Sequence, residues 1–265
     1  FGEEWKKFDQ SSISKDELNK IWRKYFSLFP WESLSEDAKG FDLGCGSGRW
    51  AFFVAPRVKE LHCIDPSSEA LNIAKKNLKN YKNCLFHNVI VDDIPFEDNS
   101  MDFGYSLGVL HHVPNTALGI KMCVNKLKPN APFLLYLYYA LDDKPLWFKG
   151  IWKASDFLRK IISILPSKLK YFASQVLALI VYLPLARLSA ILEKVGFDVK
   201  GIPLSFYRDK SFYTMRTDAL DRFGTRLEQR FTRKQIEAMM QRAGLERIVF
   251  REGEPYWCAI GYKKI

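Results

Sequence analysis

The stretch FDLGCGSG, residues 41–48, joins a short apolar run and one acidic residue to a loop with glycine at alternate positions. Glycine adopts positive φ angles without strain and lets a ligand come close to the backbone. A helix that starts after such a loop points its free N–H groups at whatever the loop holds. The stretch therefore predicts a nucleotide-type pocket at the carboxyl end of a β-strand.

Beyond this loop, short apolar runs alternate with segments of helical periodicity. The expected strands cover residues 40–43, 60–65, 84–90, 101–107 and 133–139, and the expected helices begin near residues 48, 67 and 117. This alternation predicts an α/β fold with a Rossmann-like, doubly wound and mostly parallel sheet, whose ligand lies outside the carboxyl ends of the strands. Residues 246–251 and 256–262 flank a short Gly-Glu-Pro link and predict a terminal antiparallel hairpin.

Three parts of the chain differ in their sequence pattern. Residues 1–39 predict an N-terminal helical cap, because Ser14 and Glu17 form a capping-box pattern ahead of a helical apolar face. Residues 40–140 and 232–265 carry the pattern of the ligand-binding domain. Residues 141–231 lack it and predict a large helical insertion before the last helix, which covers the site as a lid.

The overall composition sets broad limits. The 265 residues are 48% hydrophobic, enough to bury a full core, and the formal net charge is +10. A basic balance fits acidic partners such as nucleic acid, a nucleotide-sugar, phospholipid or an anionic membrane, and fits ordinary solubility equally well. The five cysteines are scattered without a C-x-x-C pair, which predicts reduced core thiols in a cytoplasmic protein, with neither a metal site nor a disulfide framework.

The spacing within the loop separates two kinds of nucleotide. A dinucleotide fingerprint is G-x-G-x-x-G, whereas this loop is G-x-G-x-G, with Arg49 where the third glycine would fall. Asp42 lies just before the loop, where it would repel a pyrophosphate but attract the ammonium group of an amino acid. Asp65 ends the second expected strand, where a carboxylate can accept hydrogen bonds from both ribose hydroxyls. An adenosine joined to an amino acid without phosphate, as in S-adenosylmethionine, fits these features.

Four segments then carry a resemblance to a known family. They are FDLGCGSG (41–48), CIDPSSEAL (63–71), DDIPFEDNSMDFGYSLGVLHHVPN (92–115) and NKLKPNAPFLLYLY (125–138). In order and spacing they resemble the motifs of the class I S-adenosylmethionine-dependent methyltransferases, over residues 40–140 and again over 232–262. A weaker resemblance, in FGEEWKKFD (1–9) and DRFGTRLEQRFTRKQI (221–236), is to methyltransferases associated with bacterial glycan biosynthesis.

The resemblance implies a set of residues that bind S-adenosylmethionine. In that family the glycines face the methionine and ribose, while Asp42 binds the amino group and Asp65 binds the ribose. An aspartate of the family that reads the adenine falls at Ile90 here, so either Asp92 takes over or backbone groups alone read the ring. The complete expected set is Trp5, Asp42, Gly44, Cys45, Gly46, Gly48, Asp65, Pro66, Val91, Asp92 and Leu107.

Two adjacent histidines are candidates for catalysis. Methyl transfer is a one-step displacement, in which the protein aligns the acceptor and, for an oxygen acceptor, removes its proton. His111 and His112 follow the fourth expected strand, and histidine titrates near neutral pH. We expect His112 as the base ahead of His111, and the alternative is that the pair only supports the fold or the cofactor. No carboxylate cluster accompanies them, so no metal is expected.

The acceptor should be bound by the insertion and by the end of the fifth strand. Lid segments of this kind usually supply substrate contacts, and arginines there could clamp a phosphate on the acceptor. The alternative is that the tyrosines are core residues and the arginines are merely solvated. The expected contacts are Tyr138, Tyr207, Tyr213 and Arg222, with Asp218 and Asp221 nearby in the sequence.

One segment of the insertion, VLALIVYLPLA from Val176 to Ala186, is unusually apolar. A bilayer span needs about 20 apolar residues, so this segment is too short, and Pro184 should interrupt it. Three interpretations stay open: a buried lid helix, a contact between two copies of the chain, or a surface that dips into a membrane. The last would place a cytoplasmic protein at the inner face of the membrane.

These observations predict a methyltransferase that uses S-adenosylmethionine. The expected reaction is O-methylation of a saccharide or of another small or lipid-linked molecule. The alternatives are C-methylation of a quinone-like ring, RNA methylation, and a cofactor-binding partner subunit without catalysis. RNA is disfavoured because no RNA-binding module is appended, and a dehydrogenase is disfavoured by Asp42 and Arg49.

Overall fold

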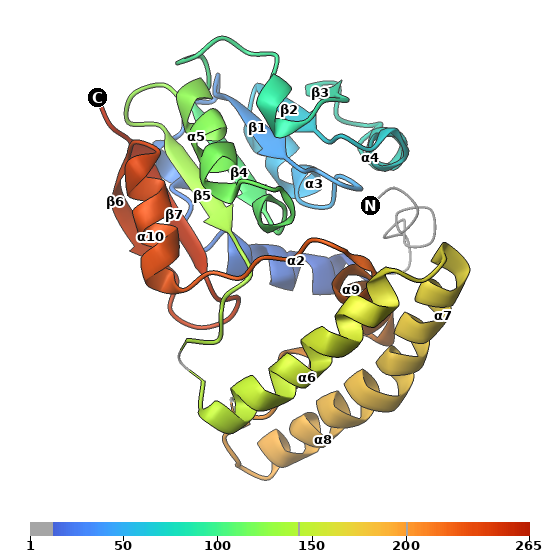
Figure 1. Ribbon diagram of the computed structural model, residues 1–265. Coiled ribbons are helices and arrows are strands. Elements are labelled where there is room, and N and C mark those ends of the chain that lie inside the picture. The colour runs from blue at the N-terminus through green and yellow to red at the C-terminus, as the bar shows by residue number, and fades with distance from the viewer. Residues whose placement is uncertain (1–12, 143, 200) are drawn as a thin grey trace.

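The computed structural model of the chain describes residues 13–142, 144–199 and 201–265, so the expected contact of Trp5 lies outside the described residues. A central sheet has helices on both faces, and a group of helices from the insertion lies below it in Figure 1.

The sheet has seven strands in the order β3-β2-β1-β4-β5-β7-β6. Five strands run parallel: β1 (Lys39–Leu43), β2 (Glu60–Ile64), β3 (Cys84–His87), β4 (Phe103–Leu107) and β5 (Pro132–Tyr136). The hairpin of β6 (Leu245–Phe250) and β7 (Cys258–Lys263) adds β7 antiparallel to β5. The strand order reverses between β1 and β4, which creates a crevice at their carboxyl ends. The predicted mostly parallel sheet with a terminal antiparallel hairpin is confirmed.

Local sequence signals start most of the helices. Thr232 and Gln235 form a capping box at the start of α10, and Ser67 is the N-cap of α4. Helices around the sheet are α2 (Lys15–Tyr25), α3 (Ala51–Val54), α4 (Ser68–Asn77), α5 (Thr116–Lys126) and α10 (Arg233–Arg242). Short 3-10 turns lie at Trp31–Ser33, Ala55–Arg57, Val91–Asp93, Leu110–His112 and Ser205–Tyr207.

The two central strands interlock through glycine and phenylalanine. In the β1–β4 register, Gly40 faces Phe103 and Gly104 faces Phe41. A Cβ atom on either glycine would lie 2.3 Å from the opposite ring, so no larger residue fits without movement of the ring. These two rings are fully buried, one in each of the two cores that cover the faces of the sheet.

Several elements are shorter than the sequence predicted, and the cause is clear for α3 and β3. The helix after the glycine loop is only the four residues of α3, because Pro56 lacks an N–H and stops it. Strand β3 ends at His87 rather than at residue 90, since the chain turns into the 3-10 turn of Val91–Asp93.

The capping box predicted at α2 forms only in part, and its acidic residue has another role. Ser14 accepts from the Glu17 N–H as predicted. The Glu17 carboxylate instead accepts from the Ser211 N–H at 3.0 Å and from the Thr214 hydroxyl at 2.8 Å, at the start of α9 (Phe212–Gly224). A carboxylate is favourable at a helix N-terminus, so Glu17 fastens the insertion to α2.

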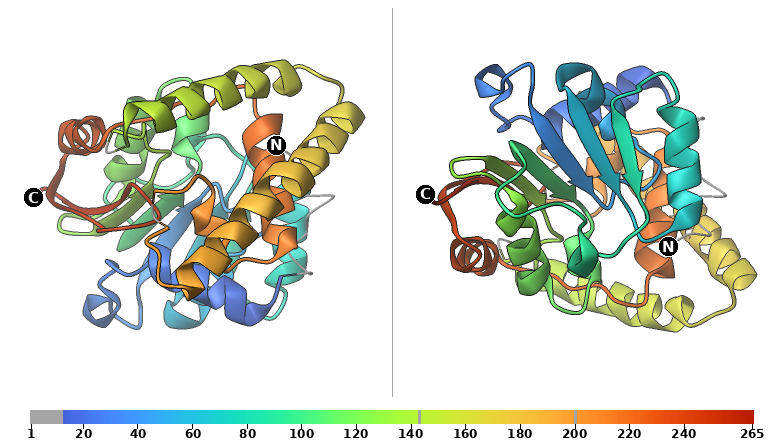
Figure 2. Two further views of the ribbon diagram at one scale, coloured as in Figure 1. Left: turned by 90° about the horizontal axis from the view of Figure 1, so that it is seen from below. Right: turned by 90° about the horizontal axis from the view of Figure 1, so that it is seen from above.

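The insertion consists of α6 (Leu146–Ser163), α7 (Ser167–Leu177), α8 (Leu183–Lys194) and α9. Figure 2 (left) shows α6 and the α7–α8 pair on the side nearest the viewer, away from the sheet. A π-helical turn, Ala178–Tyr182, joins α7 to α8, so that Ser167–Lys194 is one continuous helical stretch of 28 residues.

The length of this stretch corrects the expectation that the apolar segment 176–186 is short and is interrupted by Pro184. Pro184 does not interrupt the helical stretch: it directly follows the π-helical turn Ala178–Tyr182, the kind of local change in helix geometry that accommodates a proline. The stretch Ser167–Lys194 is long and apolar enough to cross a membrane by length and composition. Its environment is mixed: Ala178 and Tyr182 pack with Met215 of α9, whereas Ile180 is 61% exposed.

Candidate active site

The glycine loop after β1 has the backbone that its sequence predicted. Gly44, Gly46 and Gly48 have φ angles of 76°, 54° and 77°. The N–H groups of Gly44 and Cys45 both donate to the carbonyl of Ile64 at the end of β2, at 2.8 and 3.0 Å. The loop is therefore fixed over the carboxyl ends of β1 and β2.

Asp65 holds the same loop from the end of β2. Its Oδ2 accepts from the Gly46 N–H at 3.0 Å and its Oδ1 accepts from the Ser67 N–H at 2.9 Å. Burial raises the pKa of Asp65, while these two N–H donors lower it. Each carboxylate oxygen can accept a further hydrogen bond, so Asp65 can hold a ribose as well as the loop.

Replacing Asp65 with alanine is expected to weaken binding of S-adenosylhomocysteine by about 10- to 100-fold, because hydrogen bonds to a charged group contribute about 1.5–3 kcal/mol each. Isothermal titration calorimetry measures the change. Asp37→Ala is the control, since Asp37 forms an exposed ion pair with Lys59 on the surface. An unchanged affinity for Asp65→Ala would remove the ribose role.

Asp42 lies beneath the loop rather than on a cavity wall. The residue is 1% exposed, and its Oδ2 has no hydrogen-bond partner among the residues that the structure describes. Burial raises the pKa of Asp42 to about 8, and the negative charge of the neighbouring Asp65 also raises it. Tyr105 and Arg49 lower the pKa of Asp42, but by less. The Asp42 carboxyl group is therefore buried behind the loop, and its contact with the ammonium group of the donor stays a prediction.

A cavity of about 440 Å³ separates the glycine loop from the insertion. Gly44, Cys45 and Gly46 form one wall together with Leu107 and Gly108, which end β4. Aromatic side chains from α2, β5, α6 and the π-helical turn line much of the rest: Tyr25, Tyr136, Tyr138, Phe148, Trp152 and Tyr182. The cavity joins the predicted donor site to a space under the lid that both aromatic and charged side chains line.

Carboxylates of α9 reach this cavity. Burial raises the pKa of Asp218 to about 6, and the like charge of Asp221 adds to the effect. Arg49, a hydrogen bond from Tyr207, and Lys210 lower it. A carboxyl group with a pKa near the working pH is suited to remove a proton.

The second carboxylate, Asp221, is held by a tyrosine that lies just after β5. The Tyr138 hydroxyl donates to Asp221 Oδ2 at 2.6 Å, and burial raises the pKa of Tyr138 well above its usual value. Asp218 and Asp221 thus both line the cavity with a tyrosine partner. The raised pKa of Asp218 makes it the candidate for the base.

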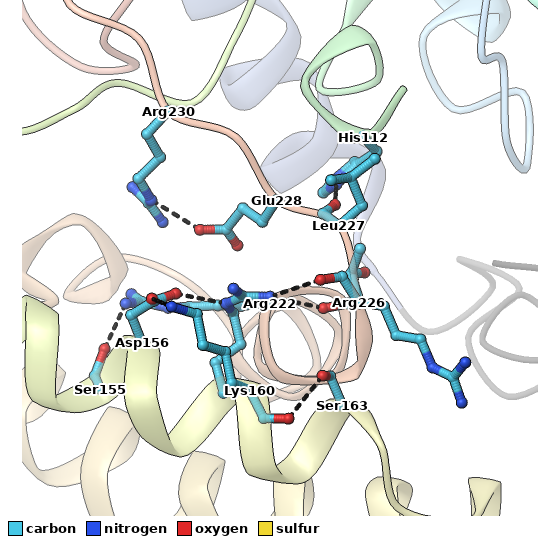
Figure 3. A network of polar contacts seen from close by, with 12 residues as sticks. His112, Ser155, Asp156, Lys160, Ser163, Arg222, Arg226, Leu227, Glu228 and Arg230 are labelled. Atoms are coloured by element: carbon cyan, nitrogen blue, oxygen red, sulfur yellow. Dashed lines mark hydrogen bonds and ion pairs between the residues drawn. The ribbon is translucent and has the colours of Figure 1, made fainter. Parts of the chain in front are cut away.

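A polar network fixes the insertion around the cavity, as Figure 3 shows. The Arg159 guanidinium of α6, which is 4% exposed, donates to the carbonyls of Thr225 and Arg226 at 2.9 and 3.3 Å. His112 Nδ1 is 2.7 Å from the Leu227 carbonyl oxygen in the same return segment. Together these contacts join α6, the segment after α9 and the turn after β4.

The predicted catalytic histidines do not line the cavity. His111 is fully buried and stacks on Tyr138 with ring centroids 3.8 Å apart, and burial, with the nearby His112 and Arg230, holds its pKa well below the usual value. His112 is tied to the return segment. Their contacts favour a structural role, in which the two histidines hold the insertion next to the end of β4. The role of His112 as the base stays a prediction, which this arrangement does not favour.

The structure brings together part of the predicted set. The cavity is lined by Gly44, Cys45, Gly46, Leu107, Tyr138, Tyr207 and Arg222. It is not lined by Asp42, Gly48, Asp65, Pro66, Val91, Asp92 or Tyr213. Gly48 instead makes room for Leu78 at the end of α4, because a Cβ on Gly48 would lie 2.8 Å from Leu78 Cδ1. Asp65 and Val91–Asp93 follow β2 and β3, where an adenosine would extend.

Sequence reasoning named Asp218 only as a neighbour of the substrate contacts and not as a candidate base. Its position on α9 carries no motif, and only its place in the cavity lining makes it a candidate. Within the described parts of the chain, no group of three or more His, Cys, Asp and Glu side chains is placed to hold a metal ion.

Loop, carboxylates and strand order together define a Rossmann-like domain of the kind that binds S-adenosylmethionine. Residues 41–135 match the family model described as "Methyltransferase domain". This match to a methyltransferase domain is expected from the resemblance of the motifs in these residues to the class I S-adenosylmethionine-dependent methyltransferases.

Similar proteins agree with this assignment. Demethylmenaquinone methyltransferase of Staphylococcus aureus is 30% identical over 129 residues, which cover 47% of this chain and 52% of that protein. The chain thus spans about half the length of the curated relatives that it matches. A Bacillus halodurans structure described as that of a methyltransferase has a TM-score of 0.54 at 14% identity, over 88% of this chain and 72% of its own.

A second similar structure contains S-adenosylhomocysteine, the product that S-adenosylmethionine leaves after methyl transfer. Phosphoethanolamine N-methyltransferase 2 of Haemonchus contortus, in complex with phosphomonomethylethanolamine and S-adenosylhomocysteine, has a TM-score of 0.50 at 15% identity. The alignment covers 89% of this chain and 39% of that one. At these identities the two structures show the fold alone.

Proposed function

We propose that this protein transfers a methyl group from S-adenosylmethionine to a hydroxyl oxygen of a largely apolar, lipid-linked acceptor. One observation carries the proposal: a single cavity connects the glycine loop with the buried carboxylate of Asp218, and its lining combines aromatic rings with charged side chains. The rings would pack on the apolar part of a lipid-linked acceptor, and the polar side chains of the lining would bind its hydroxyl-bearing part.

The residues of the site have distinct tasks in this reaction. The donor supplies an electrophilic methyl group whose bond to sulfur breaks with its electron pair left on sulfur. The glycine loop and Asp65 hold the donor, and the cavity aligns the acceptor oxygen with the methyl carbon. Asp218 takes the hydroxyl proton as the new carbon–oxygen bond forms, and Tyr207 orients its carboxylate.

The assay for this function uses S-adenosylmethionine labelled in its methyl group and a panel of acceptors. We expect label to enter the organic phase with a hydroxylated, lipid-soluble acceptor such as a polyprenyl-linked saccharide. Label recovered only in RNA or in water-soluble products would contradict the proposal.

A second candidate reaction is C-methylation of a quinone-like ring. It is favoured by the similarity to demethylmenaquinone methyltransferase and by the aromatic walls, which suit a flat ring. The same labelled product separates the two reactions, because proton NMR distinguishes a methyl group on oxygen from one on ring carbon.

A further inference from the structure

Large apolar side chains are exposed along the outer side of the insertion. Phe157 of α6 is 68% exposed, Phe172 of α7 is 67% exposed, and Ile180 of the π-helical turn is 61% exposed. We call the set the apolar lid face. It consists of Leu146, Trp147, Ile151, Phe157, Leu158, Ile161, Ile164, Leu169, Phe172, Leu179, Ile180, Val181, Leu188 and Ile191.

Basic residues flank the apolar lid face along the sequence, although Arg159 among them is buried. Residues 171–186 contain no charged side chain, and Lys168, Lys170 and Arg187 flank them. Residues 146–194 as a whole hold eight Lys and Arg against two Asp and Glu. Such a combination is typical of helices that lie in the surface of an anionic bilayer. Two copies of this face would repel each other in a symmetric dimer, whereas acidic headgroups would be attracted.

The opposite side of the α7–α8 helix explains why it should lie on a bilayer rather than cross it. Ala178, Tyr182 and Ala186 are buried against α9. Helix α9 carries Asp218 and Asp221 on the cavity side. Full insertion of α7–α8 would expose these carboxylates to hydrocarbon, at a cost of several kcal/mol each. Only the outer face is therefore suited to contact lipid.

The apolar lid face is continuous with the cavity. Ile151 of α6 is 53% exposed, Val181 is 36% exposed, and both line the cavity. Phe148 and Leu185 line it beside them. The cavity therefore reaches the surface between α6 and the π-helical turn, among side chains that water solvates poorly. Figure 2 (left) shows these helices on one side of the molecule.

We propose that the apolar lid face binds the surface of an anionic bilayer, with its apolar side chains below the headgroups. The cavity then opens toward the lipid, and the acceptor enters between α6 and the π-helical turn without passing through water. Binding of the apolar lid face to lipid does not depend on the proposed function. The entry of the acceptor from the bilayer does rest on the proposed function.

Flotation with vesicles tests the binding. The protein should float with vesicles of phosphatidylcholine and phosphatidylglycerol, and much less with phosphatidylcholine alone. The variant Phe172→Glu/Ile180→Glu changes two exposed residues that do not line the cavity, and its partitioning should fall about tenfold or more. The control Leu118→Glu/Val249→Glu changes two exposed residues of α5 and β6 and should float like the wild type.

Two further measurements keep the outcomes apart. All variants should bind S-adenosylhomocysteine as the wild type does, which would show that they are folded. If the wild type itself did not bind S-adenosylhomocysteine, that result would count against the proposed function and not against the binding of the face to lipid. Methylation of an acceptor embedded in vesicles should fall in the lid variant, whereas methylation of the same acceptor in detergent should not.

The proposal is overturned if the wild type does not float with anionic vesicles, or if the lid variant floats equally well. Sedimentation velocity identifies the competing occupant. A wild-type dimer that the lid substitutions convert to a monomer, without flotation, would assign the face to a second copy of the chain instead.

Discussion

Replacing Asp218 with asparagine is expected to lower kcat for methyl transfer by about 10²- to 10⁴-fold, the range that a general base supplies. Asparagine keeps the size of the side chain and its contact with Tyr207, but it cannot take a proton. Binding of S-adenosylhomocysteine should not change, because the donor is held by the glycine loop and Asp65. The loss should therefore appear in kcat rather than in donor affinity.

The pH profile gives the same prediction an independent measure. Burial raises the pKa of Asp218 to about 6, and the base acts only when it is ionised. Wild-type kcat should accordingly rise with pH through about 6 and level off above it. The residual activity of Asp218→Asn should lack this step.

A matched control is Asp209→Asn, because Asp209 pairs with Lys210 and does not line the cavity. It should retain wild-type kcat. If Asp218→Asn kept full activity while His112→Ala lost it, the base would be His112, and the geometric argument for α9 would fail.

The second large effect is expected from Gly44→Ala, which should abolish measurable binding of S-adenosylhomocysteine. A Cβ at residue 44 would lie 2.3 Å from Val109 Cγ2, so the loop or Val109 must move. The φ angle of 76° adds backbone strain of about 1–2 kcal/mol for any residue with a Cβ. Both effects displace the wall against which the donor would lie.

Gly150→Ala provides the control for this prediction. Gly150 lies within α6, and nothing is within 4 Å of its Cβ position. Alanine there should leave donor binding unchanged and should stabilise the helix by up to about 1 kcal/mol. Calorimetry measures binding and thermal unfolding measures stability in both variants. Wild-type affinity in Gly44→Ala would place the donor elsewhere.

The fold could be predicted in detail because its signals are local. The glycine loop, the N-cap at Ser67 and the capping box at Thr232 each depend on a few neighbouring residues, and each is present. The parallel strands are read from apolar runs of the right length. The ends of elements were less certain where a turn or a proline cut them short, as at His87 and Pro56.

The candidate site was predictable only where the sheet alone positions it. Gly44 and Leu107 follow from strand order, and both line the cavity. His112 follows β4 as expected, but sequence does not show which way a ring points, and it points to the return segment. Asp218 is distant in sequence from the loop that it faces, and no local pattern marks it. The exposed apolar lid face likewise depends on which side of a helix packs on α9.

Calorimetric titration of the wild-type protein with S-adenosylhomocysteine, and with NADH in a parallel experiment, tests the central claim most directly. The loop geometry with Asp65 predicts a saturable heat for one molecule of S-adenosylhomocysteine per chain and none for NADH. Saturable binding of NADH without any heat from S-adenosylhomocysteine would contradict the account.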